Sequence, residues 1–150
     1  MYWILFVMAA IGAVVIALII GGLATPREHV VARTMVAPIA ADALWNAVRD
    51  SMQHGSMSFS AKEEDAPRRL VADRLDDNLQ PAGTWAWLLQ PEGTGTRITI
   101  TERGSVGNPI LRFLGAFTGH KRHVDRHLRE VAERVGAPNV SISDATAPGN

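Results

Sequence analysis

The sequence predicts an α+β protein: an N-terminal transmembrane helix followed by an antiparallel sheet that packs on a long C-terminal helix. Three observations lead to this fold class. Tyr2 to Ala24 is an unbroken apolar run, Thr84 to Arg103 holds two alternating segments around a turn, and Asn108 to Val135 has apolar residues at helical spacing. An apolar sheet face and an apolar helix stripe must cover each other, so the last two segments belong to one domain.

The N-terminal run is long enough and apolar enough to cross a membrane. A helix over Tyr2 to Ala24 is about 34 Å long, and a hydrocarbon core is about 30 Å thick. A cleaved signal peptide is the alternative, because Gly22 and Ala24 resemble a cleavage site, but it would need a basic start and a shorter apolar core. We therefore expect a single-pass membrane protein, in the inner (cytoplasmic) membrane if the protein is bacterial.

Charges next to the anchor set the expected topology. Only the C-terminal flank is basic, with Arg27 and Arg33, so the domain should be cytoplasmic, although two arginines leave the opposite topology open. Over the chain, 15 basic residues balance 15 acidic ones, so we expect no nucleic-acid partner. The expected organisation is an anchor at residues 1–24, one domain at 25–136, and a disordered tail rich in Pro, Ser and Gly at 137–150.

The first half of the domain has the pattern of a strand, a helix and two further strands. Its first segment is rich in β-branched residues and ends before Pro38, as is typical of a strand. The second segment has Leu44, Trp45 and Val48 on one side, as in a short amphipathic helix. The expected elements are the strand His29–Val36, the helix Ala40–Asp50, and the strands Met57–Lys62 and Arg69–Leu75.

A hairpin is the strongest local signal in the chain. Its strands, 84–89 and 96–103, flank a Gly-rich turn, and each strand has one apolar face. The residues expected on the buried face are Trp85, Trp87, Leu89, Ile98, Ile100 and Glu102.

The last helix is expected to be the longest of the domain. Asn108 is its N-cap, Pro109 lies in its first turn, and Gly136 follows its last residue, Val135. Its apolar stripe would pack on the aromatic face of the hairpin, while its other side is basic. The stripe consists of Phe113, Phe117, Val124, Leu128, Val131 and Val135.

Several separated motifs over roughly residues 30–136 resemble one family, the polyketide cyclase/dehydrase and lipid-transport branch of the START-like (SRPBCC) superfamily. Its C-terminal half resembles Gly-Thr-Trp-Ala-Trp-Leu-Leu-Gln-Pro-Glu-Gly-Thr-Gly-Thr-Arg-Ile-Thr-Ile-Thr-Glu from Gly83 onward, and Gly-Asn-Pro-Ile-Leu-Arg-Phe-Leu from Gly107 onward. Its first strand, first helix and middle strand resemble Val36-Ala37-Pro38, Ala43-Leu44-Trp45 and Pro67-Arg68-Arg69-Leu70-Val71.

The resemblance implies a helix-grip fold, in which an antiparallel sheet wraps around the C-terminal helix and an apolar cavity between them holds a lipid or another hydrophobic ligand. The chain departs from the family pattern between Asp50 and Met57, where a few residues replace a short helix and two strands. We therefore expect about five strands and an exposed sheet edge at Met57–Lys62. That edge would either pair with a second copy in a homodimer or stay unpaired and need protection.

The candidate ligand-binding residues are those that would line the cavity: Trp85, Trp87, Ile98, Ile100, Glu102, Phe113, Phe117 and His120. Glu102 is the one charge on the buried strand face and His120 lies near the helix stripe, so the two could pair inside the cavity. Two alternatives stay open. Glu102 could lie in water at the strand end with His120 partly exposed, and the two tryptophans could be core packing alone.

We identify no arrangement of residues for catalysis, for a cofactor or for a metal. The serines near His54 lack an orienting acid. His120, His123 and His127 lie broadly on one side of a helix, but without cysteine or a carboxylate at ligand spacing a solvated basic face is the simpler interpretation.

The leading hypothesis is a noncatalytic, membrane-tethered START-like domain that binds a hydrophobic ligand, such as a lipid from the adjacent bilayer. One alternative is a protein-interaction module that pairs through the exposed edge, and another is a cyclase- or dehydratase-like enzyme. A pocket of about 300 Å³ or more lined by the candidate residues would favour ligand binding, and a filled interior would favour interaction.

Overall fold

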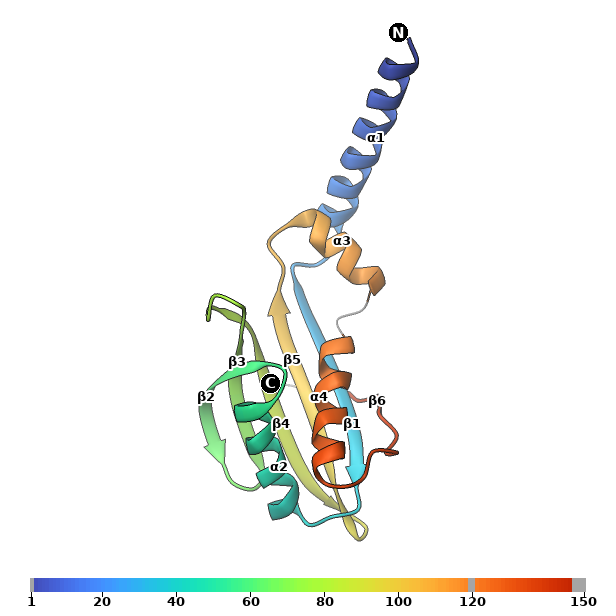
Figure 1. Cartoon of the computed structure of the whole chain (residues 1–150). Coiled ribbons are helices and arrows are strands. Elements are labelled where there is room, and N and C mark those ends of the chain that lie inside the picture. The colour runs from blue at the N-terminus through green and yellow to red at the C-terminus, as the bar shows by residue number, and fades with distance from the viewer. Residues whose placement is uncertain (1, 119–120, 147–150) are drawn as a thin grey trace. The chain divides into compact units, whose positions relative to one another are not determined.

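The computed structural model describes residues 2–118 and 121–146, and for residues 115–118 it describes the backbone only. The chain forms two compact units (Figure 1). The helical unit comprises Met1–Glu28 and Ser105–His120, and the sheet unit comprises His29–Gly104 and Lys121–Asn150.

The described part of the helical unit is built from two helices. The first, α1 (Tyr2–Ala24), is the one described helix that is long and apolar enough to cross a membrane, and its side chains are almost all exposed. The second, α3 (Pro109–Thr118), begins at the predicted N-cap, because the Asn108 Oδ1 accepts hydrogen bonds from the backbone N–H groups of Ile110 and Leu111 at 2.9 and 3.3 Å.

The sheet unit contains one six-stranded antiparallel sheet, which confirms the α+β fold class. The strands lie in the order β2-β3-β4-β5-β1-β6, so β2 forms one edge, as predicted. The bounds are β1 Glu28–Ala37, β2 Ser58–Asp65, β3 Arg69–Leu75, β4 Pro81–Glu92, β5 Gly95–Ser105 and β6 Ser143–Asp144.

The predicted hairpin and the buried face of each of its strands are confirmed. In the β4–β5 pair, Trp85 lies opposite Glu102 and Trp87 lies opposite Ile100, so both strands turn their apolar side chains to the same face. Gly93 follows β4 with φ +58° in the turn, a conformation that suits glycine because it has no Cβ.

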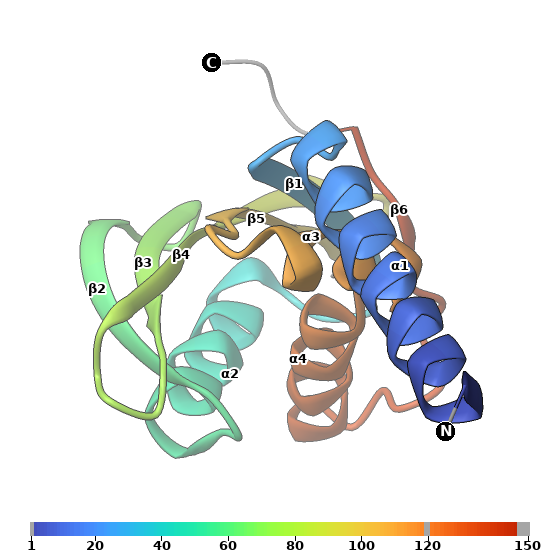
Figure 2. The same cartoon turned by 90° about the horizontal axis from the view of Figure 1, so that it is seen from above.

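Two helices cover one face of this sheet, α2 (Ala41–His54) and α4 (Lys121–Arg134) (Figure 2). The hydrophobic core lies between these helices and the sheet. The helix α2 contributes Leu44, Trp45 and Val48 to this core, and these residues form the predicted apolar side of that helix. The helix α4 contributes Val124, Leu128 and Val131.

The residues of the predicted C-terminal helix lie in two described helices, α3 and α4, and residues 119 and 120 between them are outside the described part of the chain. The helix α3 belongs to the helical unit, while α4 belongs to the sheet unit. The apolar stripe therefore has two partners: Phe113 contacts α1, and the stripe residues from Val124 onward pack on the sheet. Apolar residues at helical spacing indicate which face of a helix is buried, but they do not indicate which element packs against that face.

Part of the predicted disordered tail contacts the sheet unit. β6 pairs antiparallel with β1, with Thr34 opposite Ser143, and Val140 and Ile142 pack against the core. The prediction of a disordered tail over 137–150 therefore does not hold for residues 140–144, and residues 147–150 lie outside the described part of the chain.

Candidate ligand site

Four rings form a cluster in the interior of the sheet unit. The indole rings of Trp85 and Trp87 lie 5.7 Å apart between centroids, and Phe59 of β2 lies 5.3 and 5.2 Å from them, edge on. The fourth ring is His127 of α4, at 5.5 and 5.7 Å from the two indoles. Both tryptophans are fully buried, so the interior at this point is occupied by packed aromatic rings.

His127 is the residue that the sequence analysis placed wrongly. It was assigned to a solvated basic face, but it is only 1% exposed. Burial lowers the pKa of its imidazole from 6.5 to about 4, with Glu130 opposing the shift and Arg134 adding to it. The hydroxyl of Ser51 lies 3.4 Å from Nε2 and donates a hydrogen bond to the Val48 carbonyl at 2.7 Å.

Glu102 is buried, as the strand pattern predicted, and its partner is an arginine. Its side chain is 3% exposed, and its Oε1 lies 3.6 Å from Nε of Arg74 on β3. This distance between the two charged atoms is longer than that of a hydrogen bond, so the contact is an ion pair only. The predicted partner, His120, lies outside the described residues.

The other predicted site residues divide between the two units. Ile98 and Ile100 join Trp85 and Trp87 in the core of the sheet unit. Phe113 lies in the helical unit, where its ring is beside Gly21 of α1. The side chain of Phe117 is outside the described part of the chain.

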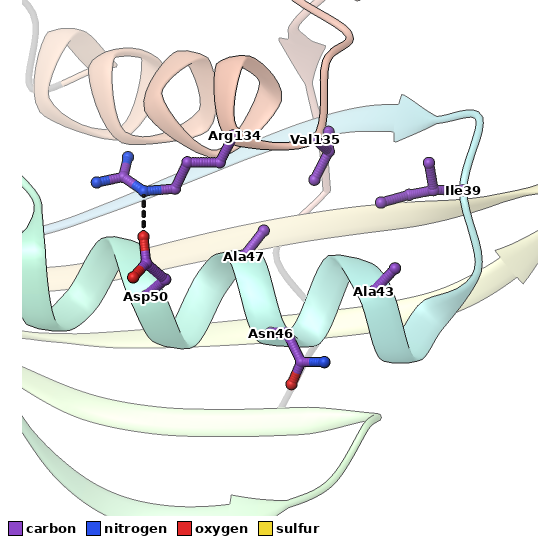
Figure 3. A pocket seen from close by; sticks show the side chains of 7 residues that line it. All are labelled: Ile39, Ala43, Asn46, Ala47, Asp50, Arg134 and Val135. Carbon is purple, nitrogen blue, oxygen red and sulfur yellow. Dashed lines mark hydrogen bonds and ion pairs between the residues drawn. The ribbon is translucent and has the colours of Figure 1, made fainter.

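A cleft of about 430 Å³ opens at the surface between α2 and α4 (Figure 3). None of the predicted site residues lines it. Its walls are mostly apolar, and three polar side chains complete them. The lining residues are Ile39, Ala43, Asn46, Ala47, Asp50, Arg134 and Val135.

One end of the cleft carries an ion pair. Nε of Arg134 donates to Oδ2 of Asp50 at 2.8 Å (Figure 3). Nδ1 of His54 lies 3.0 Å from the other carboxylate oxygen. The hydrogen bond from Arg134 lowers the pKa of Asp50, with a further contribution from His54. Near neutral pH the cleft therefore has an apolar wall and a charged end, which suits a small amphipathic molecule.

Sequence reasoning missed this cleft because its residues are far apart in the chain. Ile39 follows β1, Asp50 lies near the end of α2, and Arg134 ends α4. These three residues do not belong to a common sequence motif. For His127 a signal did exist, because it lies three residues after Val124 and four before Val131, on the stripe that the core buries.

The exposed edge strand β2 carries features that resist pairing. Its second half reads Lys-Glu-Glu-Asp, and its register with β3 shifts between Ala61 and Glu63. Charges and bulges on an edge disfavour the addition of another strand.

Comparison with known proteins shows which solved structures the chain resembles. No family model and no curated protein matches the sequence. Among solved structures, protein MLL2253 from Mesorhizobium loti is 13% identical, with a TM-score of 0.53 over 73% of this chain and 97% of that one. The Aha1 dimer from Colwellia psychrerythraea is 7% identical, with a TM-score of 0.52 over 74% of this chain and 98% of that one.

A third similar structure is the di-domain ARO/CYC BexL of the BE-7585A biosynthetic pathway. It is 11% identical, with a TM-score of 0.52 over 74% of this chain and 51% of that one, so this chain spans about half of its length. Together with the sheet order and the helices on one face, these likenesses show the expected helix-grip fold. At such identities they show the fold alone.

Proposed function

We propose that the protein is a membrane-tethered helix-grip domain that binds a small hydrophobic ligand with a polar end, such as a lipid, without catalysis. The binding site is the cleft between α2 and α4. This cleft is the observation that carries the proposal, because its volume of about 430 Å³ lies in the range of small-molecule sites and its walls are mostly apolar.

The tether is α1. It has 23 residues, no charge, and side chains exposed along almost its whole length, so a bilayer would cover an apolar surface that water would otherwise contact. Arg27 and Arg33 follow it, which favours a cytoplasmic sheet unit. A tether of this kind raises the effective concentration of membrane ligands at the cleft.

Filling the cleft is expected to remove bound lipid. Ala43 is exposed on α2 and lines the cleft, so Ala43→Phe would occupy the ligand's space without entering the core. Native mass spectrometry of the full chain released from detergent should detect extractable lipid on the wild type. We expect roughly tenfold lower occupancy in the variant, equivalent to about 1.4 kcal/mol of binding free energy.

Ala61→Phe is the matched control for this experiment. Ala61 is exposed on β2, outside the cleft, and the control chain keeps the same α1. Lipid that binds only around α1 would be present equally in all three proteins. Equal lipid content in the two phenylalanine variants would therefore contradict the cleft as the binding site.

A second candidate function is pairing of two chains through β2. It is favoured by the position of β2 at the sheet edge, where one side of the strand has no neighbour among the described strands. Hydrogen–deuterium exchange of the full chain in detergent separates the two candidates. We expect a monomer whose outward β2 amides exchange rapidly, whereas a dimer with protected β2 amides would support edge pairing.

A further inference from the structure

The contact between α3 and α1 depends on two consecutive glycines near the end of the anchor. A Cβ placed on Gly22 would overlap the carbonyl oxygen of Pro109, and a Cβ on Gly21 would lie 2.6 Å from the ring of Phe113. At position 22 only glycine lets the backbone at the start of α3 approach the backbone of α1 so closely, and at position 21 glycine leaves room for the Phe113 ring. The two helices lie together at the C-terminal end of α1 (Figure 1).

Hydrogen bonds fix the same contact. Arg112 of α3 is buried and donates to the carbonyls of Thr25 and Gly107 at 3.2 and 3.1 Å. The backbone N–H of Val106 donates to the Arg27 carbonyl at 2.9 Å. A cation at the carbonyl end of α1 is also favourable for the helix dipole.

The exposed side chains that the structure describes on α3 are apolar. Leu111 and Leu114, three residues apart on one side of the helix, are 58% and 46% exposed. Arg112, which is buried, is the only charged residue between Pro109 and Thr118. Near this contact, Ile20 and Leu23 of α1 are exposed as well, so the apolar surface of the anchor continues onto α3.

We propose that α3 is a second membrane-binding element, which lies in the bilayer interface beside the end of α1 and inserts Leu111 and Leu114 among the lipid chains. This inference rests on the proposed membrane span of α1. A short helix with one apolar side and a buried charge fits the boundary between headgroups and acyl chains better than it fits water. The chain thus meets the membrane twice, through α1 and again between β5 and α4.

Depth measurement on the full chain tests this inference. The sequence has no cysteine, so single cysteines can carry a nitrobenzoxadiazole label without further changes. The test positions are Leu111→Cys and Leu114→Cys. Ala10→Cys in α1 reports the anchor, and Ser60→Cys, exposed on β2, reports water. The proteins are reconstituted in phosphatidylcholine–phosphatidylglycerol vesicles that contain nitroxide lipids with the quencher near the headgroup or deep in the chain.

We expect blue-shifted emission at 111 and 114 with stronger quenching by the shallow nitroxide, deep quenching at 10, and no quenching at 60. Labels at 111 and 114 that behave like the label at 60, while position 10 is quenched, would overturn the α3 inference and leave the anchor intact. An unquenched label at position 10 would refute the anchor itself and the α3 inference with it.

A variant of the anchor tests whether α1 holds α3 at this depth. In the Leu114→Cys background, Gly22→Leu should displace α3 and abolish the shallow quenching at 114. Gly12→Leu is the matched control, because a Cβ on Gly12 would meet nothing within 4 Å. Unchanged quenching in both leucine variants would contradict the proposed support of α3 by α1.

Discussion

Replacing Trp87 by alanine is expected to lower the free energy of unfolding of the sheet unit by about 4 kcal/mol, the usual scale for truncating a buried tryptophan. Trp87 is fully buried in β4, between Phe59 and His127 and beside Trp85. Its truncation would remove aromatic contacts on three sides and leave a cavity that the strand cannot close. The indole Nε1 has no acceptor among the described residues, so the loss would come from packing and not from a hydrogen bond.

Urea unfolding of the full chain in detergent, followed by circular dichroism, measures this loss. Trp3→Ala is a suitable control, because Trp3 is exposed on α1 and should leave the sheet unit unchanged. A decrease below about 1 kcal/mol for Trp87→Ala would contradict the packed interior. It would support the original prediction that Trp87 lines a ligand cavity, especially if the variant also lost its lipid.

Local signals predicted most of the sheet because they depend on residues close in sequence. The alternation of Trp85, Trp87 and Leu89, and of Ile98 and Ile100, predicted the buried face of the hairpin, and the Gly-rich segment predicted where the chain turns. Because Glu102 occurs at the end of the same alternation, its burial followed from the pattern. The pattern did not predict the ion pair between Glu102 and Arg74, because β3 and β5 lie on opposite sides of β4.

The errors in predicted packing arose where a segment could pack against more than one element, because only the tertiary structure decides between such partners. Phe113 and Val124 fit one helical stripe, but α1 offers a second apolar surface, and its glycines let α3 approach. Polar composition also misled the prediction of the tail: Val140 and Ile142 are only two apolar side chains, yet they bring β6 to the edge of β1. The cleft could not be predicted at all, because only the folded chain brings Ile39 and Arg134 together.

Acidification is expected to destabilise the sheet unit through His127 before its carboxylates titrate. The pKa of this histidine is about 4 in the folded chain against 6.5 for the free side chain. As the pH falls below 6.5, the unfolded chain takes up a proton that the folded chain does not accept, so stability is lost between pH 6.5 and about 4. A difference of this size corresponds to about 3 kcal/mol.

His127→Phe should remove this part of the pH dependence. A phenyl ring keeps the edge-on contacts with Trp85 and Trp87, and Ser51 keeps its hydrogen bond to the Val48 carbonyl. Urea unfolding at a series of pH values from 7.5 down to 4.5 compares the two chains. His123→Phe, at an exposed position on α4, should retain the wild-type slope.

The carboxylates with lowered pKa values, Asp50, Asp73, Glu92 and Asp144, contribute stability that is lost only at still lower pH, as each protonates in the folded chain. That loss is common to both phenylalanine variants and to the wild type. A His127→Phe chain that loses as much stability as the wild type between pH 6.5 and 4.5 would therefore show that the imidazole is not kept neutral by burial. The aromatic cluster would then have to admit water to the ring, since a charged imidazole needs a solvated environment.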